Sequence, residues 1–228
     1  MEILTSLYDM NTALVTVLGY KLSVLEFAGT ATGFACVWLT SREKILCWPA
    51  GIVNAIFFFL MFYQLRLYSD MFLQVYFFAT SVYGWWNWTH PGSAEMANEK
   101  NELKITRLSV KEFLAATAAI AAASLAFGAL MNNIHILLPR FFPERAAYPF
   151  ADSIVAAASV VSQFIMARKK LECWIFWFSI DLLAVWIYYM KGINFVALEY
   201  AVFACIAAYG FFGWRHERAG YGEPEAAA

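Results

Sequence analysis

Three side chains within one apolar stretch have the types and spacing to bind a flat, positively charged ring. Trp174, Trp177 and Asp181 occupy positions i, i+3 and i+7, so on a helix they share one face, and Tyr188 follows two turns later. The face of a tryptophan attracts a cation by about 0.5 to 2 kcal/mol. The plainer alternative is a structural Asp that is protonated or bonded within its own helix. We favour binding, because an unpaired charge deep in an apolar helix is costly.

Four further polar side chains lie within other apolar stretches, namely Asn54, Gln74, Glu199 and Tyr200. A polar side chain in a membrane helix often makes only a hydrogen bond to another helix, and for Asn54 or Gln74 taken singly this alternative is equally good. Taken together, the eight side chains predict one substrate site. The cysteine and histidine spacings match no metal site or catalytic motif, so we expect no metal, no cofactor and no enzyme activity.

Acidic residues fall towards the same ends of four predicted helices: Glu26, Asp70, Asp152 and Glu199. An acidic entrance would raise the local concentration of a cation that approaches the site. Helix capping and solvation at the membrane interface are the alternative, and for Glu26 and Asp70 this alternative is equally good.

The composition places these residues in a lipid bilayer. Apolar residues make up 62% of the chain and charged residues only 14%, against about 25% in soluble domains. Helices are expected because every backbone group must find its partner within the segment, and the alternation of a membrane barrel is absent. We expect seven helices, near 22–41, 45–63, 69–89, 111–131, 150–167, 171–190 and 193–214. The expected partners are the bilayer and a small molecule, and no nucleic acid.

The region from Arg42 to Trp88 occurs twice in the chain. An ungapped offset of 126 positions places it on residues 168–214, with nine of 47 positions identical. Both copies open with a basic residue followed by Cys-Trp and close with Tyr-Gly-x-x-x-Trp. Glu26 also falls on Asp152, so the duplicated unit begins before Arg42. We interpret this pattern as an internal duplication.

Two copies of three helices need one additional helix between them if they are to run in the same direction. The alanine-rich stretch 111–131 suits that linking role, because small residues allow close helix packing. The predicted division has six parts: an N-terminal outer interfacial segment (1–20), a first bundle (21–90), a polar cytoplasmic linker (91–110), the linking helix with an outer loop (111–149), a second bundle (150–215) and a cytoplasmic tail (216–228). We expect the tail to be disordered after Glu217. Parallel repeats of this kind are typical of transporters, with the substrate between them.

The basic residues predict the orientation. Eleven Lys and Arg residues lie after predicted helices 1, 3, 5 and 7, and five lie on the opposite side. By the positive-inside rule the N-terminus is outside and the C-terminus is cytoplasmic, and we find no signal peptide. Trp85, Trp86, Trp88 and Trp214 fall near the cytoplasmic ends, where we expect an aromatic belt at the membrane interface.

The motifs of both halves resemble the PnuC family of vitamin transporters. The similarity rests on Lys-Ile-Leu-Cys-Trp-Pro-Ala-Gly-Ile-Val-Asn-Ala (44–55), Tyr-Gln-Leu-Arg-Leu-Tyr (63–68), Leu-Gln-Val-Tyr-Phe-Phe (73–78) and Tyr-Gly-Trp-Trp-Asn-Trp (83–88). In the second half it rests on Trp-Ile-Phe-Trp-Phe-Ser-Ile-Asp (174–181) and Leu-Glu-Tyr (198–200).

This resemblance implies an all-α membrane protein with a three-plus-one-plus-three arrangement like that of the SWEET sugar transporters. It also implies facilitated uptake of nicotinamide riboside, a precursor of NAD, across a bacterial cytoplasmic (inner) membrane, and a homo-oligomer, for which a trimer is one arrangement. Asn is common in the family where this chain has Asp181. An acid there strengthens the preference for a cation or points to thiamine.

Other functions remain as alternatives. Thiamine or another vitamin or nucleoside is the first of them, and an uncharged sugar ranks lower because it gives no reason for Asp181 and Glu199. A membrane receptor that does not transport, or a membrane enzyme, is the alternative from another class. A photoreceptor is excluded because Lys191 lies in a predicted loop and not within the last helix.

Overall fold

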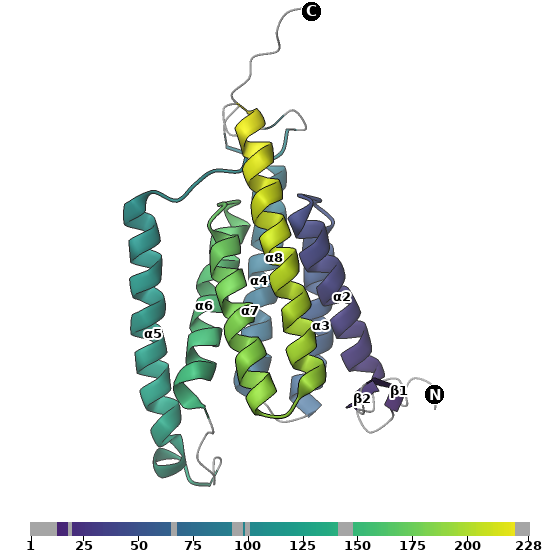
Figure 1. Cartoon of the computed structure of the whole chain (residues 1–228), viewed down its shortest axis with the longest axis vertical. Coiled ribbons are helices and arrows are strands. Elements are labelled where there is room, and N and C mark those ends of the chain that lie inside the picture. The colour runs from purple at the N-terminus through teal and green to yellow at the C-terminus, as the bar shows by residue number, and fades with distance from the viewer. Residues whose placement is uncertain are drawn as a thin grey trace, which may run out of the picture.

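The computed structural model describes residues 13–17, 20–64, 68–92, 98, 101–140 and 148–221. The described residues contain seven helices. They run side by side (Figure 1). They are α2 (Val24–Ser41), α3 (Cys47–Gln64), α4 (Tyr68–Thr89), α5 (Val110–Leu137), α6 (Pro149–Ala167), α7 (Cys173–Met190) and α8 (Asn194–Gly220). Two short antiparallel strands, β1 (Ala13–Val17) and β2 (Tyr20–Ser23), precede α2. The all-α prediction is confirmed for the membrane part, and the hairpin is an addition to it.

Local sequence signals explain where several helices begin. Ser23 caps α2 and Ser109 caps α5, in both cases with a glutamate three residues later whose side chain accepts the N–H of the cap residue. Pro149 opens α6, where its missing N–H costs nothing.

Three predicted boundaries were wrong. Residues 22 and 23 belong to β2 and not to the first helix. The linking helix continues to Leu137, six residues beyond its predicted end, because Asn133 Nδ2 donates to the helix's own carbonyl at Ala129 (2.8 Å) instead of breaking the helix. The last helix continues to Gly220, through part of the predicted tail. Of the predicted segment 1–20, residues 13–17 form β1, and residues 1–12 lie outside the described part of the chain.

The helices form a ring of six with α5 outside it. Contacts join α2 to α3, α3 to α4, α4 to α6, α6 to α7, α7 to α8 and α8 back to α2, whereas α5 packs on α6 (Figure 1). The first unit is α2–α4 and the second is α6–α8, and the α4–α6 and α8–α2 junctions are equivalent under the duplication. We call the end at which α2, α4, α6 and α8 finish the basic end, because Arg42, Arg168 and Arg215 lie there.

Five of the seven helices are long and apolar enough to span a membrane by composition alone: α3, α5, α6, α7 and α8. α2 and α4 are also at least 18 residues long, but polar residues such as Glu26, Thr30 and Gln74 lower their mean hydropathy. Both occupy places in the ring between apolar helices, so their polar faces need not meet lipid.

The duplication is visible in the packing of two tryptophans. Trp48 lies against Gly84, where a Cβ would overlap the indole ring. Its equivalent Trp174 lies against Gly210, where a Cβ would come within 2.7 Å of the ring. The repeated Tyr-Gly pair is therefore explained, because only glycine leaves room for the ring.

The same symmetry relates the contacts between the two units. Trp88 Nε1 donates to the carbonyl of Met166 (3.3 Å), and its equivalent Trp214 donates to the carbonyl of Thr40 (3.0 Å), which is the equivalent of Met166. The prediction that Trp88 and Trp214 belong to an aromatic belt was wrong, since both are fully buried between the units. Trp85 and Trp86 are exposed, as such a belt requires.

Candidate substrate site

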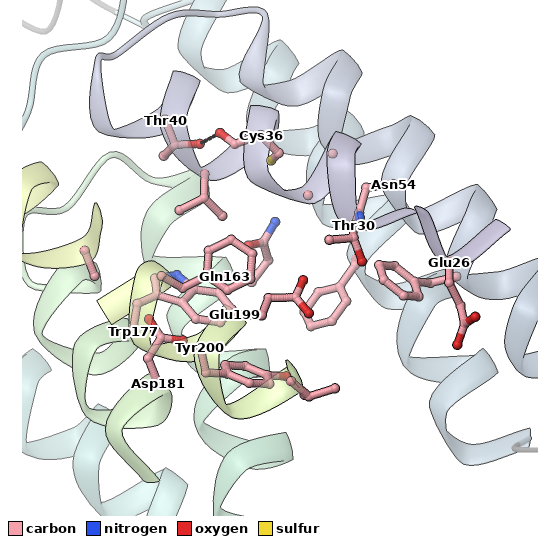
Figure 2. Close-up of a pocket in the computed structure, with 18 of the residues that line it drawn as sticks. Glu26, Thr30, Cys36, Thr40, Asn54, Gln163, Trp177, Asp181, Glu199 and Tyr200 are labelled. Carbon is pink, nitrogen blue, oxygen red and sulfur yellow. Dashed lines mark hydrogen bonds between the residues drawn. The ribbon is translucent and has the colours of Figure 1, made fainter. Parts of the chain in front are cut away.

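A cavity of about 500 Å³ lies inside the ring of six helices (Figure 2). Its wall includes Glu26 in the first turn of α2 and Ile193 before α8, which lie at the end opposite the basic end. Towards the basic end the lining stops at Thr40 and Met166. The volume is typical of a small-molecule site. We call it the central cavity.

One face of α2 contributes a stripe along the cavity: Glu26, Thr30, Gly33, Val37 and Thr40 all line it. The spacing of three and four residues places them in one row on the helix. Two of these side chains satisfy their own hydrogen bonds locally. Glu26 Oε2 accepts the backbone N–H of Ser23 (2.7 Å), and Thr40 Oγ1 donates to the carbonyl of Cys36 (2.8 Å).

The structure places seven of the eight predicted site residues on the wall of the central cavity, and they come from three helices: Asn54, Trp174, Trp177, Asp181, Tyr188, Glu199 and Tyr200. Gln74 is buried in α4 (8% exposed) but does not line the cavity. The lining residues of α4 are Phe77 and Ser81, one and two turns closer to the basic end.

Asn54 has a structural role as well as a place on the wall. Its Nδ2 donates to the carbonyl of Gly29 in α2 (2.7 Å) and so joins α3 to α2. Gly33 permits this approach, since a Cβ there would lie 3.0 Å from the same nitrogen. The Asn54 amide therefore has one of its two N–H donors engaged by the protein.

The two predicted tryptophans differ in their surroundings. Trp174 is 2% exposed, with its ring against Gly210 and edge-on to Trp214 at a centroid distance of 5.5 Å. Trp177, one turn further into the membrane region, is only half-buried. The Nε1 atoms of both tryptophans lack a hydrogen-bond partner in the described part of the chain, so the difference between the two lies in their burial. Trp177 is therefore the tryptophan whose ring is available to a ligand.

The predicted charges lie on the same wall. Figure 2 shows Asp181 of α7 and Glu199 of α8 beside Trp177 and Tyr200. Asp181 is 5% exposed. Tyr188 and Tyr200 stack with their centroids 5.4 Å apart and their planes 9° from parallel, which joins α7 to α8 next to these carboxylates. Two carboxylates beside an aromatic surface suit a flat cation.

The predicted acidic entrance is only partly assembled. Glu26 lines the cavity but also caps α2, and Asp152 forms a salt bridge with Lys191 (3.1 Å). Asp70 is exposed and does not line the cavity. Of these four residues, only Glu199 lines the cavity and neither caps a helix nor forms the salt bridge with Lys191.

Sequence reasoning missed four polar lining residues: Thr30, Thr40, Ser81 and Gln163. Gln163 is 8% exposed and projects from α6 (Figure 2). The available signal was a lone amide within the apolar stretch 150–167, a feature of the same kind as Gln74. Helix periodicity alone did not reveal which of the two glutamines faces the cavity.

Four tryptophans close the ring between the cavity and the basic end: Trp48, Trp88, Trp174 and Trp214, each at most 2% exposed. Neighbouring rings meet edge-on or nearly so, at centroid distances of 5.1 to 5.7 Å. We call this group the tryptophan cluster. Because it is buried and apolar, a polar solute cannot pass it without a rearrangement of the two units.

A segment of the linker covers the tryptophan cluster. Leu103 and Ile105 are buried against the cluster, and the N–H of Leu103 donates to the carbonyl of Trp88 (2.9 Å). The N–H of Ile105 meets the hydroxyl of Tyr221 at 3.5 Å, and burial raises the pKa of Tyr221 to about 12, so its phenol stays neutral. Arg107 pairs with Glu172 of the second unit (2.9 Å). The linker thus ties the two units together at the basic end.

Comparison with known proteins identifies the family. A model of the family described as nicotinamide mononucleotide transporter matches residues 23–216. The chain belongs to this family. Its members are transporters and not enzymes, so the predictions of a membrane transporter and of no enzyme activity are confirmed. In the described part of the chain no three His, Cys, Asp or Glu residues are grouped to hold a metal ion.

Several transporters are similar to this chain over most of their length. The chain is 31% identical to the nicotinamide riboside transporter PnuC of Escherichia coli over 214 residues, which covers 86% of this chain and 87% of the relative. It is 22% identical to the riboflavin/roseoflavin transporter RibM of Streptomyces davaonensis, with 83% of each chain covered. A crystal structure of the vitamin B3 transporter PnuC has the same fold, with a TM-score of 0.63, 20% identity, and 87% of this chain and 83% of that chain covered.

Proposed function

We propose that this protein transports nicotinamide riboside across the bacterial cytoplasmic membrane by facilitated uptake, without ion coupling. Nicotinamide riboside carries a pyridinium ring, a carboxamide and a ribose. The observation that carries the proposal is the meeting of Trp177, Asp181 and Glu199 on one wall of a cavity of about 500 Å³. The ring cation would lie over Trp177, with the two carboxylates balancing its charge.

The family relationship supports the same substrate. The Escherichia coli relative is a nicotinamide riboside transporter, and its similarity extends over nearly the whole chain. The other named relative, RibM, is a transporter of riboflavin and roseoflavin, so family membership alone leaves the vitamin open. The carboxylates favour a cation over these flavins, because a buried negative charge is stabilised by a positive ligand.

Binding and flux test the proposal together. Calorimetry on the purified protein should show binding of nicotinamide riboside, and vesicles containing the protein should equilibrate the labelled riboside with no ion gradient. Trp177→Ala should weaken binding by about tenfold or more, through loss of stacking and the cation–π interaction. Trp186→Ala is the matched control, since Trp186 belongs to the same helix but is 51% exposed and does not line the cavity.

Three results would contradict the proposal in different ways. Tighter binding of thiamine than of the riboside would replace the substrate and keep the site. Binding without flux would indicate a receptor. If the Trp186 variant lost as much affinity as the Trp177 variant, the ligand would not lie over Trp177.

We also propose the orientation that the basic residues favour. The basic end faces the cytoplasm, and the N-terminus lies outside. The cavity in this structure then reaches towards the outside, and the tryptophan cluster closes it towards the cytoplasm. A fluorescent reporter fused to the C-terminus should be active in the cytoplasm, while an alkaline phosphatase fusion there should be inactive.

The oligomeric state is proposed from the family resemblance. We propose a homo-oligomer, with a trimer as the arrangement to test first. α5 stands outside the ring and exposes Leu114, Leu125 and Phe127, so it offers an apolar surface to lipid or to another copy. The mass of the protein in detergent by light scattering, corrected for bound detergent, would give the number of chains.

A further inference from the structure

Gln163 is a largely buried residue on the wall of the central cavity, and its amide has no hydrogen-bond partner among the described residues. Gln163 is 8% exposed and lines the cavity from α6, one turn before Met166. No side chain or backbone group in 13–17, 20–64, 68–92, 98, 101–140 or 148–221 bonds to this amide. The amide nitrogen and oxygen are not enclosed by protein and open onto the cavity, so they are available to a group that enters it.

The duplication shows that packing does not require an amide at this place. The equivalent of Gln163 in the first unit is Val37, which lines the same cavity from α2. The two positions sit in equivalent helices, and the first unit fills its position with an apolar side chain. The amide is therefore an addition of the second unit.

Two other polar groups of the second unit that line the cavity also lack hydrogen-bond partners among the described residues. Within the described residues, Trp177 Nε1 is buried without a partner and Asp181 accepts no hydrogen bond. Gln163, Trp177 and Asp181 all line the central cavity from α6 and α7, and Figure 2 labels them on its wall. An indole N–H can only donate and a carboxylate can only accept, whereas the amide of Gln163 can do both.

We propose that Gln163 is a specificity-determining residue that recognises a carboxamide on the substrate ring, an inference that rests on the proposed function. A carboxamide carries an N–H donor and a carbonyl acceptor side by side, as the glutamine amide does, so the two form paired hydrogen bonds in opposite directions. With the ring over Trp177, a carboxamide on that ring has Gln163 as its amide neighbour. A hydroxyl group could use only part of this capacity.

The test varies the protein and the ligand together. Nicotinamide riboside is compared with N-ribosylpyridinium, which keeps the ring charge and the ribose but lacks the carboxamide. In the wild-type protein, loss of the carboxamide should weaken binding about threefold to tenfold, as expected for one or two neutral hydrogen bonds. In Gln163→Leu the two ligands should bind equally well, because the partner of the carboxamide is gone.

Two further variants separate recognition from folding. Gln74→Leu removes an equally buried glutamine that does not line the cavity, and it should keep the wild-type ratio between the ligands. Gln163→Glu keeps the shape and one acceptor but removes the N–H₂ donor, so it should recover only part of the ratio.

The inference is overturned if Gln163→Leu keeps the wild-type ratio between the two ligands. It is also overturned if Gln163→Leu and Gln74→Leu change the ratio by the same factor, because the effect would then come from the fold. In both cases the wild-type protein still binds nicotinamide riboside, so the proposed function survives. If the wild-type protein binds neither riboside, the proposed function fails and the role of Gln163 fails with it.

Discussion

Glu43 and Lys169 occupy equivalent positions in the two repeats, and their side chains form a salt bridge between the repeats. Lys169 Nζ lies 3.2 Å from Glu43 Oε2 and 4.6 Å from the centre of the Trp88 ring. Both residues have a left-handed backbone, with φ of 55° and 52°. Burial raises the pKa of Glu43, and the Lys169 charge opposes this effect. The pair lies at the basic end, where the structure is closed.

Charge reversal at this pair should be rescued by the opposite reversal. Glu43→Lys or Lys169→Glu alone places two like charges together in a buried site and should cost about 3 kcal/mol or more in stability. The double variant, Glu43→Lys with Lys169→Glu, should regain most of this loss because the two positions share one backbone conformation. Thermal unfolding of the four proteins in one detergent measures the coupling.

The Asp152–Lys191 salt bridge is the matched control, since its side chains are 51% and 27% exposed. Reversing either of its charges should cost about 1 kcal/mol or less. The stability losses of the two single variants can be added to predict the stability of the double variant at 43 and 169. If the double variant is no more stable than this sum predicts, the salt bridge does not stabilise the closed end.

Alanine at the repeated glycines should destabilise both repeats. A Cβ at Gly84 or Gly210 would lie within 3 Å of a buried indole, so each substitution should cost about 1 to 3 kcal/mol through overpacking. Gly213→Ala in the same helix as Gly210 is the control, because its nearest contact would be an ordinary 3.6 Å. The melting temperature of the Gly213→Ala control should lie near that of the wild type. An equal fall in melting temperature in all three variants would exclude overpacking as the explanation.

Trp174 and Trp177 should respond differently to substitution. Trp174→Ala empties a buried position beside Gly210 and should cost about 3 to 5 kcal/mol in stability, as should Trp48→Ala at the equivalent position. Trp177→Ala should reduce ligand affinity with a smaller loss of stability, because its ring faces the cavity and is only half-buried. Unfolding and calorimetry on the same samples would show the contrast. Equal losses of stability in both would contradict it.

Asp181→Asn should reduce the preference for cationic ligands. The substitution keeps the size of the side chain and removes its charge at a site that is 5% exposed. Affinity for nicotinamide riboside should fall by about tenfold, and affinity for an uncharged analogue with a reduced ring should change little. Competition binding with both ligands measures the ratio. An equal change for both would mean that Asp181 does not sense the ligand charge.

The amino-acid sequence by itself determined the helices, their duplication and several of the polar and aromatic side chains that line the central cavity. Apolar stretches and their polar ends marked seven helices, and the offset of 126 positions predicted that the units would be equivalent. The i, i+3, i+7 spacing predicted that Trp174, Trp177 and Asp181 share one face, and in the structure all three line the central cavity. These features are local or periodic, so they follow from the helix geometry alone.

Only the tertiary structure decided which faces turn inward. Gln74 and Gln163 look alike in sequence, yet only Gln163 lines the cavity, because the wall is set by how six helices close the ring. The same closure buries Trp88 and Trp214 between the units, although each lies at or next to the end of a predicted helix, where an interface position was expected. It also pairs Glu43 with Lys169, which are 126 residues apart and whose contact depends on the symmetry between the repeats.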